Sequence, residues 1–164
     1  MKKFLIPLSL LLLLATVLAT SAWAGPLEDS LAADAKGDYA TELKIIRPLA
    51  VQGVDWAQFN LALMYDTGQG VVQDYTEAVK WYRLAAAQGN ASAQFNLALM
   101  YAKGKGVVQD YIRAHMWFNL GAVSGDKDAV KNRDIVASKM TPQQIGEAQK
   151  RARECQARQF KNCD

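Results

Sequence analysis

The residues of this chain that could perform chemistry are few. His115 is the only histidine, and Cys155 and Cys163 are the only cysteines among 164 residues. General-base catalysis needs a base placed beside a nucleophile, and the sequence assigns no such partner to His115. One histidine and two cysteines are also too few ligands for a zinc finger or an iron–sulfur cluster. We therefore expect no catalytic residue, no metal and no cofactor, and we interpret His115 as a solvated or packing residue.

Residues 1–24 have the three parts of an export signal. A basic start is followed by an apolar run from Phe4, and Ala-Trp-Ala at 22–24 fits the small-x-small cleavage pattern. The alternative is an uncleaved membrane anchor, because the run is long enough to span a bilayer. Pro7 and the cleavage pattern argue against an anchor. We expect residues 25–164 to be exported, to the periplasm or out of a bacterial cell, without stable membrane insertion.

In an exported chain, a disulfide between Cys155 and Cys163 is the first expectation. If both cysteines stayed in one helix, they would lie about 12 Å apart at a rise of 1.5 Å per residue. That distance is too long for a disulfide. The bond therefore requires the helix to end near Gln159 and the chain to fold back. The alternative is a pair of free thiols.

The elements that position these residues follow from an internal repeat. Residues 57–92 and 93–128 are identical at 21 of 36 positions. A period of this length indicates stacked supersecondary units. Apolar residues at helical spacing predict a first helix from about Ala57 to Tyr65. The glycines that follow this helix predict a turn with backbone angles that side chains disfavour.

The second helix of each unit has its own start and stop signals. Asp74 is a predicted N-cap, and Glu77 three residues later resembles the second half of a capping box. Gly89 predicts the end of this helix. The small residues of this helix should let the paired helices approach closely, while Trp81 and Tyr82 fill the space between neighbouring units.

The repeat continues more weakly in both directions. Residues 27–56 predict a degenerate first unit with Gly37 between its helices, and 126–139 predict a third first-helix. Thr141-Pro142-Gln143-Gln144 has a cap, a proline and a capping-box glutamine, which predicts a last helix that runs to about Gln159. The expected organisation is all-α with about eight helices and no strand. Its parts are a signal peptide at 1–24 and a repeat domain at 25–164 that comprises 27–56, 57–92, 93–128 and the C-terminal capping helices at 129–164.

The repeated pattern is very similar to Sel1-like repeats, which are relatives of the tetratricopeptide repeat. The resemblance implies an α-solenoid of antiparallel helix pairs that serves as a binding scaffold, usually without catalysis of its own. Ala62 and Ala98 depart from the family's usual glycine. The matching residues of the first copy are Ala57, Leu61, Tyr65, Gly68, Gly70, Val71, Asp74, Ala78, Trp81, Tyr82, Ala85, Ala86 and Gly89.

The resemblance also implies a binding stripe. In the tetratricopeptide fold, the inner stripe of the first helices lines the concave surface, and an asparagine before the Leu-Gly pair often contacts a bound peptide. An amide suits this role because it both donates and accepts hydrogen bonds. The alternative is that the asparagines are solvated helix residues and the phenylalanines pack between units. The candidate residues are Phe59, Asn60, Leu63, Phe95, Asn96 and Leu99, with Asn132 as a third asparagine that is followed by Arg133 and Asp134.

The charge of the chain excludes one class of partner. Its formal net charge is +3, which is too small for a strongly basic nucleic-acid-binding protein. A solvated capping face explains the basic residues of the last helix, and a surface for anionic lipid or lipopolysaccharide is the alternative. These residues are Lys150, Arg151, Arg153, Arg158 and Lys161.

These observations favour one function over two alternatives. The leading hypothesis is a non-enzymatic, exported scaffold that binds a protein or peptide on the concave face of its first helices. The first alternative is a cell-envelope enzyme that acts on peptidoglycan-type material. The second is a purely structural envelope module. The sequence does not identify the partner.

Overall fold

The computed structural model describes residues 25–163. The predicted signal peptide, residues 1–24, lies outside the described residues. The chain divides into two compact units, with the boundary between Ile45 and Ile46. This boundary falls inside α2 (Tyr39–Val51), and we describe the two units separately.

The first unit contains a helix at residues 25–35 and the start of α2. Gly37 lies between the two helices with a φ of 68°, in the left-handed region that favours glycine. Asp38 accepts a hydrogen bond from the backbone N–H of Thr41 at 3.1 Å, which is the contact of an N-cap. The predicted turn at Gly37 is therefore confirmed.

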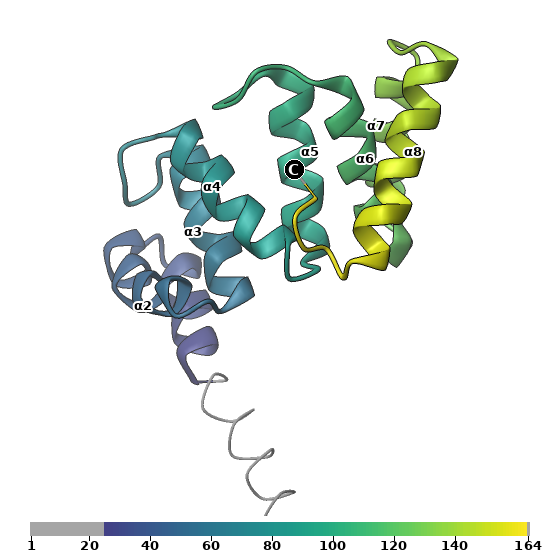
Figure 1. Ribbon diagram of the computed structural model, residues 1–164. Coiled ribbons are helices and arrows are strands. Elements are labelled where there is room, and N and C mark those ends of the chain that lie inside the picture. The colour runs from purple at the N-terminus through teal and green to yellow at the C-terminus, as the bar shows by residue number, and fades with distance from the viewer. Residues whose placement is uncertain (1–24, 164) are drawn as a thin grey trace, which may run out of the picture. The chain divides into compact units, whose positions relative to one another are not determined.

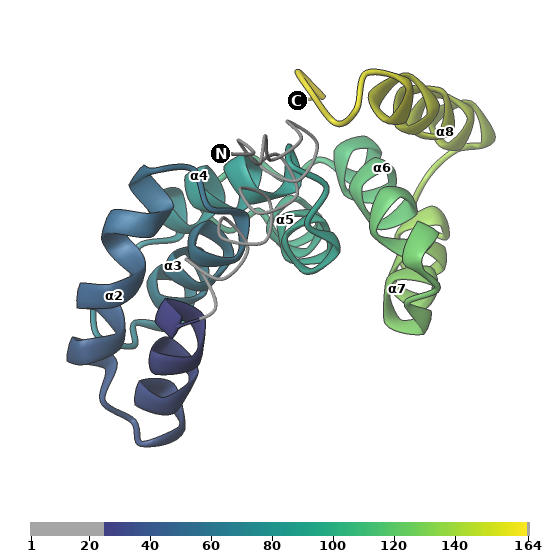
Figure 2. The same ribbon diagram turned by 90° about the horizontal axis from the view of Figure 1, so that it is seen from below.

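The second unit holds the two strong repeats and the last helices (Figures 1 and 2). Together with residues 25–35 and α2, its helices bring the total to eight α-helices and no strand within residues 25–163, which confirms the all-α expectation. The elements of this unit are α3 (Asp55–Thr67), α4 (Tyr75–Ala86), α5 (Ala91–Lys103), α6 (Tyr111–Gly121), the 3-10 turn η1 (Ala122–Ser124), α7 (Lys127–Ala137) and α8 (Pro142–Ala157).

The loops between paired helices explain the glycine pairs. Gly104 and Gly106 both have a φ of 67°. A Cβ on Gly106 would also collide with the backbone carbonyl of Tyr75, so the loop of the second repeat lies directly on the start of α4. Lys105 of this loop places its Nζ 4.6 Å from the centre of the Tyr75 ring. The glycine therefore permits a close contact between neighbouring repeats.

The helix caps agree with the sequence in all but one detail. Asp74 accepts hydrogen bonds from the backbone N–H groups of Thr76 and Glu77. The Glu77 carboxylate does not complete a capping box, because it binds Lys80 at 3.1 Å instead. Thr141 forms the complete capping box predicted for α8. That helix ends at Ala157, slightly before the expected end.

The core of the second unit centres on α6. Successive helices pack from α3 to α7, and α8 then returns to pack on α6 (Figure 1). Gly121 of α6 approaches α5 closely, because a Cβ there would lie 3.4 Å from the Ala91 carbonyl oxygen. The side chains of α6 that this packing buries include Met116, Trp117, Phe118 and Leu120. Both C-terminal helices therefore pack on the second helix of the second repeat.

Candidate functional site

The predicted stripe occupies the same positions on α3 and α5. Its residues are only half-buried, whereas the packing residues beside them, such as Leu61 and Leu97, are fully buried. Thus each first helix has one face in the core and a second face that retains access to solvent. The half-buried members are Phe59, Asn60 and Leu63 on α3, and Phe95, Asn96 and Leu99 on α5.

The two phenylalanines also contribute to packing. The Phe59 ring lies 6.0 Å from the Tyr82 ring, centroid to centroid, and the Phe95 ring lies 5.6 Å from that of Phe118. In each repeat the first helix therefore places an aromatic ring on the second helix. Such pairs stabilise a protein by about 0.5–1.5 kcal/mol beyond their buried area. The two phenylalanine rings therefore stabilise the helix pairs and also leave part of their surface exposed on the stripe.

Asn96 is held by a hydrogen-bond chain from the preceding repeat. Its Nδ2 donates to the Tyr82 hydroxyl at 3.2 Å, and that hydroxyl donates to the Asp66 carboxylate at 3.4 Å. Burial of the ring and the nearby Asp66 charge raise the pKa of Tyr82, which therefore remains a neutral hydroxyl. These two hydrogen bonds fix the orientation of the Asn96 side-chain amide and leave its side-chain carbonyl oxygen to accept from another donor.

The other two asparagines differ because their surroundings lack this hydroxyl. The positions equivalent to Tyr82 are Ile46 before Asn60 and Phe118 before Asn132. Within residues 25–163, Asn60 makes no side-chain hydrogen bond, while Asn132 donates to the backbone oxygen of Asp128 at 2.9 Å. The three equivalent amides therefore differ: that of Asn60 is unbonded, that of Asn96 is bonded to the preceding repeat, and that of Asn132 is bonded to its own helix.

Tyr82 is the residue that sequence reasoning missed. The pattern predicts a spacer between units at this position, whereas the hydroxyl links Asp66 to Asn96. The exchange of tyrosine for phenylalanine between Tyr82 and Phe118 is the signal that could have identified it. A buried tyrosine needs a hydrogen-bond partner that a phenylalanine does not.

His115 is a buried residue of α6, with 3% of its surface exposed. Its Nδ1 atom is buried and has no hydrogen-bond partner in the part of the chain that the structure describes. Burial and the Arg133 guanidinium lower the pKa of His115, and the Asp134 carboxylate opposes this shift. The structure therefore places His115 as a neutral packing residue.

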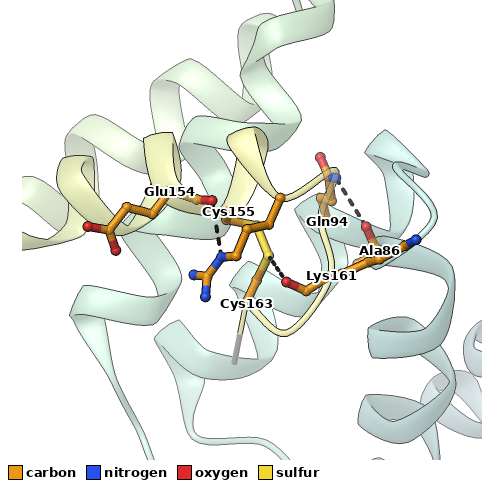
Figure 3. The surroundings of a disulfide bond; sticks show 7 residues. Ala86, Gln94, Glu154, Cys155, Lys161 and Cys163 are labelled. Carbon is orange, nitrogen blue, oxygen red and sulfur yellow. Dashed lines mark hydrogen bonds between the residues drawn. A yellow bond between two sulfur atoms is a disulfide. The ribbon is translucent and has the colours of Figure 1, made fainter.

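The cysteines form the expected disulfide, with Cα atoms 5.2 Å apart (Figure 3). The chain folds back after α8 through three residues with positive φ, namely Gln159, Phe160 and Asn162. In this fold-back, the Phe160 ring contacts Gly89 between α4 and α5, where a Cβ would lie 3.2 Å from the ring. The disulfide loop therefore anchors the end of α8 to the connection between α4 and α5.

The basic residues of the last helix are partly neutralised by carboxylates of the same helix. Arg151 binds Glu147 at 2.7 Å, and Lys150 lies 4.0 Å from Glu154. Arg158 donates from Nε to the Glu154 backbone oxygen at 3.2 Å, which satisfies a carbonyl at the helix end. Two of the basic side chains of α8 are thus paired with carboxylates, and the capping role of its basic face stays a prediction.

The described part of the chain was also searched for metal-binding clusters and for membrane-spanning helices. Among residues 25–163, no three side chains of His, Cys, Asp or Glu lie together in a way that could hold a metal ion. No helix in the same range has the length and apolar character needed to cross a membrane.

Comparison with known proteins identifies the repeats. A family model described as Sel1 repeat matches residues 57–90 and 91–126. Among solved structures, a protective antigen of uropathogenic Escherichia coli strains that displays an SLR fold is similar, with a TM-score of 0.69 and 30% identity, over 74% of this chain and 27% of that one. A Sel1 repeat protein from Oxalobacter formigenes has a TM-score of 0.60 and 30% identity, over 65% of this chain and 42% of its own. The chain thus spans less than half the length of either relative. No curated protein matches the sequence.

Proposed function

Because its two repeats make this chain a Sel1-repeat protein, we propose that it is an exported scaffold that binds a protein or peptide on the first-helix face of α3 and α5. Sel1 repeats generally mediate protein–protein interactions. Proteins of this kind are typically scaffolds without catalysis. The burial of His115 supports a scaffold over an envelope enzyme, since a substrate would have to reach a base that is 3% exposed.

One observation carries the proposal: an aromatic, an amide and a leucine recur at equivalent half-buried positions on α3 and α5. The leucines Leu63 and Leu99 offer apolar contact area, and the amides of Asn60 and Asn96 offer hydrogen bonds. An extended peptide needs both kinds of contact, because its backbone groups must be paired and its side chains must be buried.

The two amides differ in the hydrogen bonds that they can offer to a ligand. Asn60 has both its donor and its acceptor available to a ligand, whereas Asn96 is oriented by Tyr82 and offers its carbonyl oxygen. Asn132 is bonded to its own helix, and Lys131 stands where the other repeats have phenylalanine. We therefore assign the centre of the face to α3 and α5 and only its edge to α7.

Site-specific photo-crosslinking in cells that express the protein tests this assignment. A benzophenone amino acid replaces Leu63 or Leu99 in two variants, and exposed Thr76 on α4 in a control variant. We expect both face variants, and not the control, to crosslink to the same protein. Adducts that are equally abundant from all three positions, or absent from both face positions, would overturn the proposal.

Export is the second part of the proposal. The basic start, the apolar run and the cleavage pattern at 22–24 support it, as does the disulfide, which is typical of oxidising compartments. N-terminal sequencing of the protein recovered outside the cytoplasm should give Gly25 as the first residue. An intact Met1 on a membrane-bound product would contradict this expectation.

A further inference from the structure

α7 is held by little buried surface. Of its 11 residues, only Ala129 and Val136 are buried side chains, and its main neighbour is α6. By comparison, seven residues of α6 are buried. Helices with little buried apolar surface open at a lower free energy than the core around them. A small change where α6 and α7 meet can therefore release α7 without unfolding the remainder of the unit.

His115 lies where these two helices meet. Arg133 of α7 places Nη1 3.5 Å from the Asn119 side-chain oxygen, one helical turn beyond His115 on α6. The Arg133 guanidinium is also close enough to act on the imidazole charge. His115 is buried, and no described residue pairs with its Nδ1. A protonated ring would have two N–H donors at a position with no acceptor for one of them.

The charges that face His115 come from α7. Arg133 and Asp134 bind each other at 2.9 Å, and the Arg133 guanidinium disfavours a positive charge on the ring more than the Asp134 carboxylate favours it. The only charged residue of α5 is Lys103 in its last turn, and η1 has none. α8 carries the charged residues Glu147, Lys150, Arg151, Arg153 and Glu154, and its two carboxylates pair with Arg151 and Lys150. The charges that shift the pKa of His115 are those of Arg133 and Asp134. A positive charge on His115 would therefore be uncompensated.

We propose that protonation of His115 opens the α6–α7 contact, so that the chain releases α7 in mildly acidic solution. The opening gives the imidazolium access to water and removes it from Arg133. Because Asn132 lies on α7, acid would also alter the edge of the binding face. This consequence rests on the proposed function, whereas the opening does not.

The pH range follows from the sign of the pKa shift. In the open form the pKa of His115 is the ordinary value of about 6.5, and in the closed form it is lower. The open form therefore binds more protons, and closure is favoured fully above pH 6.5. Below that pH, the ratio of open to closed molecules rises by up to about tenfold per pH unit until the closed form itself takes up the proton.

Hydrogen exchange of the disulfide-bonded protein without a ligand tests the proposal. Amide protection factors, corrected for intrinsic exchange, are compared at pH 7.5 and pH 5.0. We expect protection in α7 to be lower at pH 5.0 than at pH 7.5, while protection in α5, which has no histidine, stays constant. Equal protection of α7 at the two pH values would overturn the proposal.

Two pairs of variants assign the effect to His115. His115→Val introduces the residue that the first repeat has at the equivalent position, buried Val79, and should make α7 protection independent of pH. His115→Gln replaces it if the valine variant does not fold. Arg133→Gln should weaken the acid response, and Lys131→Gln on the exposed side of α7 should leave it unchanged. An acid response that persists in the His115 variants would overturn the proposal, and neither result depends on the crosslinking outcome.

Discussion

Single residues at equivalent positions behave differently here because their neighbours differ. Asn60, Asn96 and Asn132 are separated by whole multiples of the repeat, yet only Asn96 meets a tyrosine hydroxyl. A hydrogen bond that holds an amide in one orientation reduces the entropy lost on binding. The proposed face therefore has one pre-oriented amide and one that can adapt to its ligand.

The double variant Asn60→Ala/Asn96→Ala tests the two amides together. Each lost hydrogen bond should cost about 0.5–1.5 kcal/mol, so binding of the crosslinked partner should weaken about 5- to 150-fold. The melting temperature should fall by no more than about a few degrees, because Asn96→Ala removes the hydrogen bond to Tyr82 but alanine is the better helix former at both positions. Calorimetric titration and thermal unfolding measure the two quantities. Unchanged affinity, or a large drop in melting temperature, would contradict the assignment.

Gly104 and Gly106 provide a matched test of the contact between repeats. Both have a φ of 67°, so alanine costs about 1 kcal/mol of backbone strain at either position. At Gly106 the new Cβ also meets the Tyr75 backbone, whereas at Gly104 its nearest neighbour is the Gln109 Cβ at 3.3 Å. Denaturant unfolding should show that Gly106→Ala lowers the unfolding free energy by at least about 1 kcal/mol more than Gly104→Ala. Equal losses of unfolding free energy would show that the loop at Gly106 does not contact the start of α4.

At the scale of elements, the end of α8 is the part most dependent on a covalent link. Gln159, Phe160 and Asn162 adopt positive φ, which costs most side chains about 1 kcal/mol or more each. The disulfide and the contact of Phe160 with Gly89 hold this fold-back in place. Without the bond, the relaxed loop would withdraw Phe160 from the helix connection.

The variant Cys155→Ala/Cys163→Ala should therefore destabilise the end of α8. Closure of a nine-residue loop contributes about 2.5 kcal/mol in the chain-entropy model. We expect a lower unfolding free energy by about this amount, with faster exchange of the Gly89 region. A reductant should reproduce the loss in the parent protein and have no effect on the variant. Alkylation of two thiols in the native exported protein would contradict the bond itself.

The sequence predicted those elements that depend on local chemistry. The caps at Asp74 and Thr141 and the turn at Gly37 follow from residues close together in the sequence, and the repeat period follows from the identity between residues 57–92 and 93–128. The prediction of a capping box with Glu77 was wrong, because Lys80, one turn along the helix, binds the Glu77 carboxylate. The packing of α8 on α6 depends on residues far apart in the sequence, which a local pattern does not contain.

The candidate site was predictable only in part for the same reason. The repeat places Asn60 and Asn96 at equivalent positions, and the structure leaves both half-buried. The hydrogen-bond chain through Tyr82 joins α3, α4 and α5, so no single helix reveals it. The unpaired Nδ1 of His115 likewise depends on how α6 is covered.

Across the stack of the second unit, position in the array decides the environment of a residue. Leu84 on α4 is 43% exposed, whereas Leu120 at the equivalent position of α6 is 4% exposed. Lys80 is exposed and its counterpart Met116 is fully buried. The difference arises because α8 packs on α6. A repeat near the end of a solenoid thus needs an apolar second helix where an earlier repeat does not.

Exchange of residues between these equivalent positions tests this dependence. Lys80→Met removes an exposed pair with Glu77 and a cation–π contact 5.6 Å from the centre of the Trp81 ring, so the unfolding free energy should change by less than about 1 kcal/mol. Met116→Lys places an ammonium group in the contact with α8, where we expect a loss of about 3 kcal/mol or more and the release of α8. Denaturant unfolding measures both changes, and exchange of the α8 amides locates the second. A tolerated lysine at 116 would mean that α8 does not cover this face of α6 in solution.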